Sequence, residues 1–226
     1  MRRASYRHAY LLAALLLTVF VRPLLGLDLQ RGPFALIDVL FVAVLLAAVH
    51  ACASRGRDFF VFLALAGLAL ATRAGWRAFG TEPWFVAKAA AGAGAILLAA
   101  ILVLGQVFRD RRITADTIFA SIAVYLLVGL LWAELFGLLL VFDPGAFELG
   151  QGDVGTREAK LVAFSFVTLT TLGYGNVVPV GARADALATL EAIVGQMYVA
   201  VVVARLVGIQ VSQALAPAGR DGDYQE

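Results

Sequence analysis

Long apolar stretches alternate with short polar breaks along the chain. The apolar stretches cover approximately residues 10–25, 34–53, 59–72, 84–108, 113–142 and 184–213. The breaks are turn-rich or charged, as in the run Arg109-Asp110-Arg111-Arg112. A helix needs about 20 mainly apolar residues to cross the hydrocarbon core of a bilayer. The pattern therefore predicts six transmembrane helices, and the first and third are short enough that Arg22 and Arg73 are expected to reach towards the membrane surface.

One further apolar stretch, residues 159–170, is too short to cross a membrane. It lies between a glycine-rich loop at 143–158 and the last predicted span. Irregular backbone at membrane depth is tolerated only where it is buried in protein or lines a cavity. We therefore predict an all-α membrane protein with six transmembrane helices, plus a re-entrant helix and loop between the fifth and sixth.

Composition agrees with this fold class. Of the 226 residues, 62% are hydrophobic and 15% are charged, and the mean hydropathy is +0.88, which is too apolar for a soluble domain. The net charge of +2 comes without a basic cluster, so nucleic acid is not an expected partner. The one cysteine, Cys52, excludes an intrachain disulfide and a cysteine-based metal site. His8 and His50 are isolated and no nucleophile–base spacing is present, so we do not expect an enzyme.

The loop after the short stretch reads Thr170-Thr171-Leu172-Gly173-Tyr174-Gly175-Asn176. Glycine adopts positive φ at little cost, and a backbone that alternates between ordinary and glycine conformations can point successive carbonyl oxygens to one side. Several copies around an axis would then form stacked oxygen rings that replace the water around a cation. The alternative interpretation of this loop is an ordinary extracellular turn.

This loop resembles the filter of the K⁺ channel superfamily, with Leu172 where valine is commoner and Asn176 where aspartate is commoner. The whole chain resembles bacterial channels with six transmembrane helices and one pore. The resemblance implies that Thr171, Leu172, Gly173 and Tyr174 coordinate K⁺, and that Gly175 and Asn176 form the filter mouth. It also implies a homotetramer in the lipid bilayer of the cell membrane, with the filter opening outside and both termini in the cytoplasm. The Lys/Arg counts of the loops, eight inside and seven outside, do not fix this orientation by themselves.

The sequence departs from the family at the support of the filter. In many relatives a tryptophan or glutamate of the pore helix bonds the filter aspartate. The corresponding positions here are Phe164 and Val167, and the aspartate is Asn176. K⁺ coordination by the backbone is expected to survive this change, whereas the stiffness of the outer filter mouth is left open.

The last span carries a second family feature, Gly195, which follows Gly175 by 20 residues. The resemblance implies a hinge of the inner helix, and the alternative is a glycine that lets helices pack closely. A helical wheel places Gln196, Val199, Val203 and Val207 on one stripe, which is expected to line the inner cavity. The wheel turns Glu191 and Arg205 away from that stripe. Glu191 is interpreted as a filter brace near Ser165 and Thr168 or as a protonated packing residue, and Arg205 as a residue that reaches to the inner membrane surface.

The domains predicted from this pattern are a four-helix domain at 1–112, a pore domain at 113–216 and a short cytoplasmic tail at 217–226. The fourth span carries only Lys88, while Arg73 and Arg77 are placed in the preceding loop, so strong voltage dependence is not expected. The leading hypothesis is a K⁺-selective channel. The alternatives are a weakly selective cation channel and a non-conducting membrane subunit or sensor.

Overall fold

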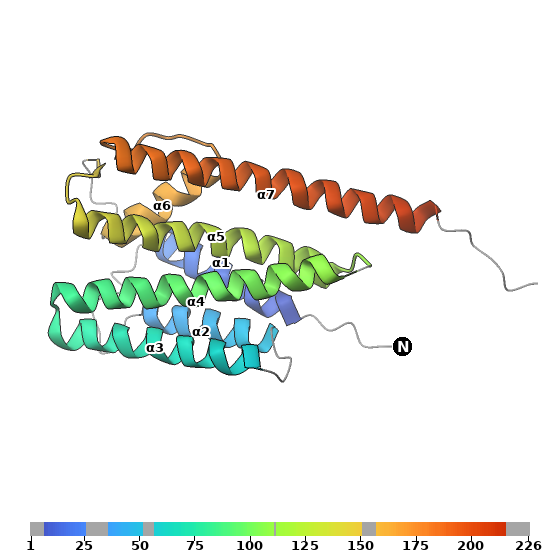
Figure 1. Ribbon diagram of the computed structural model, residues 1–226, viewed down its shortest axis with the longest axis horizontal. Coiled ribbons are helices and arrows are strands. Elements are labelled where there is room, and N and C mark those ends of the chain that lie inside the picture. The colour runs from blue at the N-terminus through green and yellow to red at the C-terminus, as the bar shows by residue number, and fades with distance from the viewer. Residues whose placement is uncertain (1–6, 26–35, 52–56, 111, 151–156, 216–226) are drawn as a thin grey trace, which may run out of the picture.

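The computed structural model describes residues 7–25, 36–51, 57–110, 112–150 and 157–215. The chain forms a bundle of helices joined by short connections (Figure 1). The elements in chain order are α1 (Arg7–Leu25), α2 (Leu36–Ala51), α3 (Arg57–Phe79), α4 (Glu82–Arg109), α5 (Ala115–Phe142), β1 (Phe147–Glu148), α6 (Arg157–Leu169), β2 (Val178–Pro179) and α7 (Ala182–Leu215). The predicted tail at 217–226 lies outside the described residues.

Local signals set the ends of the long helices. Pro83 lies in the first turn of α4, where its missing N–H is not needed. The side chain of Thr114 accepts a hydrogen bond from the backbone of Thr117 at 3.2 Å and caps the start of α5. Asp110 follows α4 in an extended conformation, and the chain then turns back into α5.

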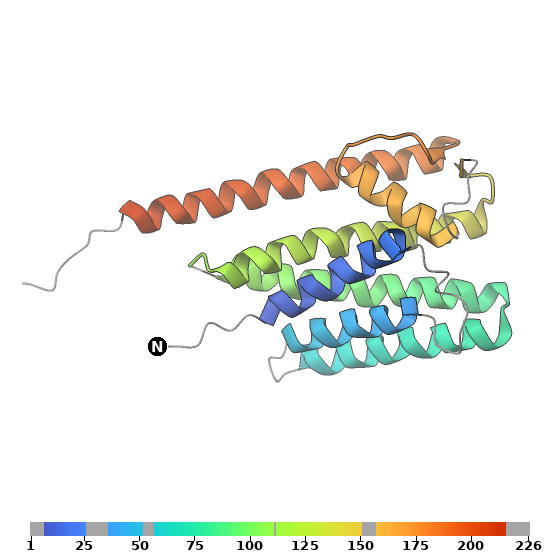
Figure 2. The ribbon, with the colours of Figure 1, turned by 180° about the vertical axis from the view of Figure 1, so that it is seen from behind.

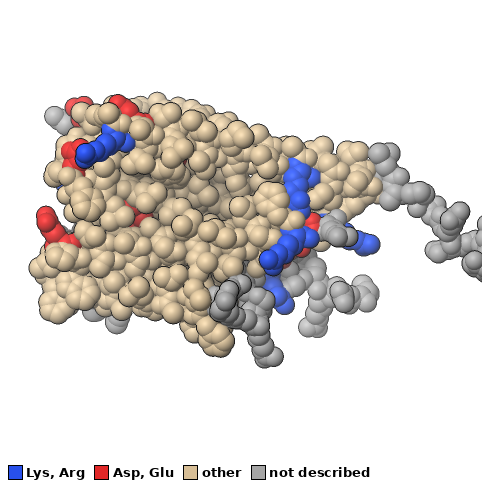
Figure 3. Space-filling view, in the orientation of Figure 1, with Lys and Arg blue, Asp and Glu red and all other residues tan. Residues whose placement is uncertain are grey.

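Among the described residues, four helices are long and apolar enough to cross a membrane, namely those over Phe59–Phe79, Glu82–Arg109, Ala115–Phe142 and Ala182–Gln213. The described apolar parts of α1 and α2 are shorter, Arg7–Phe20 and Leu40–His50. Four of the six predicted spans thus have the length and composition that suit a membrane. Figure 3 agrees with a membrane-embedded bundle, because most charged side chains on this face gather at two levels along the long axis, with a mainly uncharged band between them.

Helices α1 to α5 share one hydrophobic core, which runs from Leu11 and Leu15 of α1 to Val124 and Leu127 of α5. Figures 1 and 2 show α3, α4 and α5 side by side, with α1 and α2 covering the other side of this layer. The short helix α6 lies between α5 and α7. The helices on the two sides of the predicted domain boundary at 112/113 are therefore in contact, because α5 packs both against α1 and α4 and against α6 and α7.

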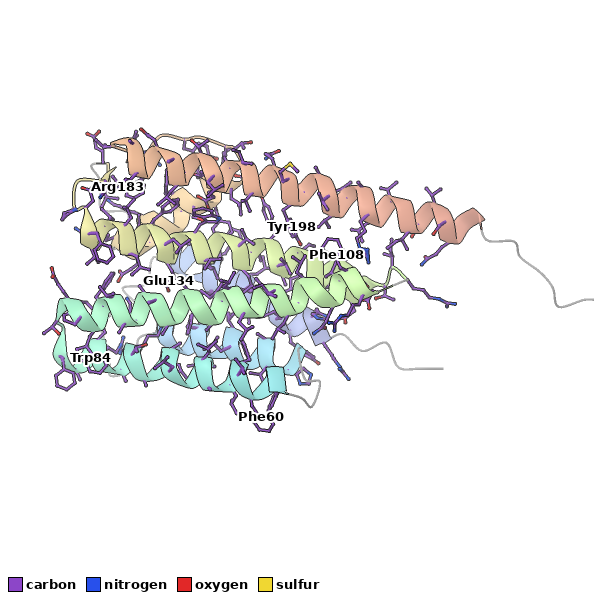
Figure 4. The ribbon with its side chains drawn as sticks, in the orientation of Figure 1. Phe60, Trp84, Phe108, Glu134, Arg183 and Tyr198 are labelled. Atoms are coloured by element: carbon purple, nitrogen blue, oxygen red, sulfur yellow. The ribbon has the colours of Figure 1, made fainter. Side chains whose placement is uncertain are left out.

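The third helix is longer than its uncharged stretch, and this corrects the placement of two arginines. Arg73 and Arg77 belong to α3 and not to a loop. Arg73 is buried, and it donates a hydrogen bond at 3.1 Å to Glu134 of α5, so it does not reach to the surface. Its guanidinium also lies 3.4 Å from the ring centre of Phe41 in α2. Figure 4 shows Glu134 between α4 and α5, where Gly92 leaves room for the pair.

Breaking this ion pair should destabilise the fold. Glu134→Leu should lower the free energy of unfolding by about 3–5 kcal/mol, because the Arg73 charge would stay buried without its carboxylate. The double variant Arg73→Leu/Glu134→Leu should be more stable than Glu134→Leu alone. Thermal unfolding in detergent measures both, with Glu82→Leu as the control that removes an exposed carboxylate. Equal stability of the single and double variants would contradict the pairing.

Candidate functional site

The loop at 170–176 begins as the cap of α6. The N–H of Thr171 donates to the carbonyl of Thr168 at 2.9 Å, and the N–H of Leu172 donates to the carbonyl of Val167 at 2.8 Å. Thr171 has a left-handed backbone with φ of 58°. This combination is a Schellman motif, which pairs carbonyls that the end of a helix leaves free. The loop is thus fixed to α6 through the N–H groups of Thr171 and Leu172, and that of Thr170 also donates to α6, to the carbonyl of Phe166 at 3.1 Å.

Left-handed residues then recur at every second position of the loop. The φ angles of Thr171, Gly173 and Gly175 are 58°, 67° and 76°, whereas Leu172 and Tyr174 do not have positive φ. The two glycines follow the alternation expected from the sequence. Thr171 was not expected to take part, because a β-branched residue rarely adopts positive φ. The Schellman motif supplies the reason, since its C′ residue is left-handed.

The residues predicted to coordinate a cation are open to the surroundings of a single chain. All positions from Thr171 to Asn176 are exposed, with 55% of Leu172 and 69% of Tyr174 accessible. The loop therefore packs on α6 at its start and leaves its remaining side uncovered.

The end of α6 is held from behind by α5 and α7. The hydroxyl of Tyr125 in α5 donates to the carbonyl of Leu169 at 3.1 Å. Gly195 of α7 lies against the same carbonyl, and a Cβ atom added there would overlap it. Tyr198 of α7 donates to the carbonyl of Ser121 in α5 at 2.6 Å (Figure 4). The last residue of α6 is therefore fixed between two long helices.

The side chain of Glu191 in α7 is fully buried, and it contacts Ser165 of α6. The hydroxyl oxygen of Ser165 lies 2.5 Å from Oε1 of Glu191 and 2.7 Å from the carbonyl oxygen of Gly129 in α5. Ser165 of α6 thus links Glu191 of α7 to α5. The interpretations of Glu191 as a filter brace and as a protonated packing residue both stay predictions.

The stripe predicted to line a cavity lies on an exposed face of α7. Gln196, Val199, Val203 and Val207 are all exposed in the single chain. The lining role of this stripe stays a prediction that depends on how several chains assemble.

The two positions that correspond to filter partners in relatives have different surroundings. The Phe164 ring is buried, and its centre lies 5.1 Å from that of Phe136 in α5 and 5.3 Å from that of Phe147 in β1. Phe164 therefore packs α6 against α5 and β1. Val167 contacts the loop through its backbone carbonyl, which accepts from Leu172.

Arg205 has a partner that sequence reasoning missed. Its Nη2 atom lies 3.0 Å, 2.8 Å and 3.0 Å from the carbonyl oxygens of Val107, Phe108 and Asp110. These carbonyls are at the end of α4, where helical partners run out and the helix dipole is negative. Arg205 therefore binds the end of α4 and is not simply a residue that reaches to the membrane surface. Carbonyl acceptors occur at every residue, so no sequence signal marks this contact.

The contact of Gly195 with Leu169 yields a test of the hinge hypothesis. In the structure α7 is an unbroken helix through this position. Gly195→Ala should lower the free energy of unfolding by about 1–3 kcal/mol, because the added methyl group would push the end of α6 away. Gly208→Ala is the matched control in the same helix, since nothing lies within 4 Å of its Cβ position. If both variants unfold at the same temperature and only Gly195→Ala opens less often, the hinge is favoured over packing.

Comparison with known proteins gives a match for the part of the chain from α5 to α7. Residues 113–211 match a family model described as ion channel. The searches of curated proteins and of solved structures gave no match. The matched region contains α5, α6, the filter loop, β1, β2 and most of α7, whereas α1 to α4 lie before it. The match supports an ion channel domain in this part of a membrane protein, and residues 113–211 are thus similar to the ion channel family.

Proposed function

We propose that this chain is one subunit of a K⁺-selective channel that conducts K⁺ passively through a homotetrameric pore. The observation that carries the proposal is the alternation of left-handed residues at Thr171, Gly173 and Gly175 in an exposed loop. Such a backbone can direct successive carbonyl oxygens to one side, and rings of carbonyl oxygens replace the hydration shell of K⁺. The two glycines provide this conformation without side-chain strain.

A tetramer would cover the surfaces that one chain leaves open. Only 11% of the most apolar window of α7 is buried within its own chain. Large apolar residues are exposed around this helix: Leu190, Ile193, Val194, Met197, Val199, Val201, Val203, Val207 and Val211. Figure 1 shows α7 at the edge of the bundle, with its C-terminal part extending past the other helices. Neighbouring copies would pack against part of this surface, and Gln196, Val199, Val203 and Val207 would line the central cavity.

The elements around the loop suit the re-entrant arrangement. With 13 residues, α6 is too short to cross a bilayer, and its C-terminal end leads directly into the filter loop. The C-terminal end of a helix carries a partial negative charge, which favours a cation on the axis of the tetramer. The filter would open to the outside of the cell membrane, and both termini would lie in the cytoplasm.

The purified protein in liposomes should carry K⁺ with little Na⁺ flux. Gly173→Ala should remove this selectivity, because a residue with a side chain is strained at φ of 67° and the backbone would relax. Gly208→Ala, in open space on α7, is the matched control and should keep it. Comparable K⁺ and Na⁺ permeability of the parent would favour a weakly selective cation channel. Absence of flux from a folded tetramer would favour a non-conducting subunit.

The channel should depend only weakly on voltage. In α4, Nζ of Lys88 lies 3.5 Å from Glu158 of α6 and 4.7 Å from the ring centre of Phe85. Arg73 of α3 is paired with Glu134 of α5. Moving one charge through the whole field is worth about 2.3 kcal/mol per 100 mV, so two paired charges cannot give steep gating. Current recorded across a range of voltages measures this, and a gating valence of several charges per channel would contradict it.

A further inference from the structure

The segment after α5 runs alongside the segment after the filter loop. Strand β1 pairs with β2 in antiparallel fashion, with Phe147 opposite Pro179 and Glu148 opposite Val178. The N–H of Val180 also donates to the carbonyl of Ala146 at 2.8 Å. These bonds fix the chain that leaves the filter mouth to the chain that leaves α5.

Gly150 extends this contact to the mouth itself. A Cβ atom at Gly150 would overlap the carbonyl oxygen of Asn176, the last residue of the filter motif. Gly150 also has a positive φ of 33°. The backbone at 150 therefore passes directly against the backbone of Asn176, which a residue with a side chain would prevent.

Lys160 holds this segment in place from the first turns of α6. Its Nζ atom donates to the carbonyl of Leu149 at 3.0 Å and to that of Gly150 at 3.1 Å. Hydrogen bonds from a charged donor are stronger than those between neutral groups. Lys160 thus connects the helix that begins the filter to the segment that touches its end.

The side chain of Asn176 makes no hydrogen bond within the described part of the chain. We propose that Lys160 and Gly150 position the outer filter mouth. The segment from β1 to Gly150 contacts Asn176 and is called the brace. This inference rests on the proposed function, and it assigns Lys160 as a positioning residue that acts on the filter through Leu149 and Gly150. The brace holds the mouth in its conducting form when few K⁺ ions occupy the filter.

The first test compares Lys160→Met with Arg157→Met in liposomes. Arg157 is an exposed cation three residues earlier on α6, so the control removes the same charge without removing the bonds to residues 149 and 150. We expect the K⁺-to-Na⁺ permeability ratio of Lys160→Met to fall about tenfold, because both charge-assisted hydrogen bonds from Lys160 to residues 149 and 150 are lost. Conduction should also decay faster than in the parent when external K⁺ is replaced by Na⁺. Lys160→Arg keeps a charged donor and should restore both properties.

Hydrogen exchange of the backbone N–H groups of residues 176–178 and 180 provides a readout that does not need conduction, because Pro179 has no N–H group. Lys160→Met and Gly150→Ala should exchange about tenfold faster than the parent there. Gly145→Ala, in the same segment with ordinary space around its Cβ position, should not. An unchanged exchange rate in Lys160→Met and Gly150→Ala would overturn the brace. Faster exchange with an unchanged K⁺-to-Na⁺ permeability ratio would show that Lys160 has only a structural role and would overturn its positioning role. A parent that carries no K⁺ would overturn the channel proposal, while exchange would still decide whether Lys160 holds this segment.

Discussion

The arrangement of the second half of the chain depends on one constraint, which is that backbone polar groups at membrane depth need partners. The N–H groups of Thr171 and Leu172 meet this need by bonding carbonyls of α6. Within the described part of the chain, the carbonyls from Leu172 to Asn176 accept no hydrogen bond, and under the proposed function their partner is a cation. A loop with free carbonyls has to be held by its surroundings. Tyr125 and Gly195 contact Leu169, directly before the loop. Lys160 bonds the segment that contacts the end of the loop at Asn176.

The sequence predicts the parts of this structure that follow from hydrophobicity and from glycine. Long apolar runs predict most of the helices closely, because a bilayer-length apolar run has few other stable conformations, whereas α3 continues past its predicted end at residue 72 to Phe79. Gly173 and Gly175 indicated positive φ because glycine lacks a Cβ atom. Thr171 could not be predicted in the same way. Its left-handed conformation follows from the end of α6, so it depends on where the helix stops and not on its own preference.

Contacts between polar groups that are far apart in the sequence could not be predicted. Each involves a charged residue whose sequence position indicates a loop or the membrane surface. The sequence predicts Arg73 in the loop before the fourth span, reaching towards the membrane surface. The charge is instead paired with Glu134, which is 61 residues away in the sequence. Lys160 and Arg205 bond backbone carbonyls, which every residue possesses. Only the three-dimensional arrangement selects which carbonyl each one meets.

Two sets of contacts join the first four helices to α5 and α7. The face of α5 that does not hold α6 belongs to the same core as α1 to α4. At the far end, Arg205 of α7 bonds the last carbonyls of α4, and its guanidinium lies 4.8 Å from the Phe108 ring centre. A movement of α7 beyond Gly195 must therefore break these bonds or carry the end of α4 with it. Because breaking them would leave these carbonyls without the guanidinium that bonds them, Arg205 links α7 to α4 at this end of the bundle.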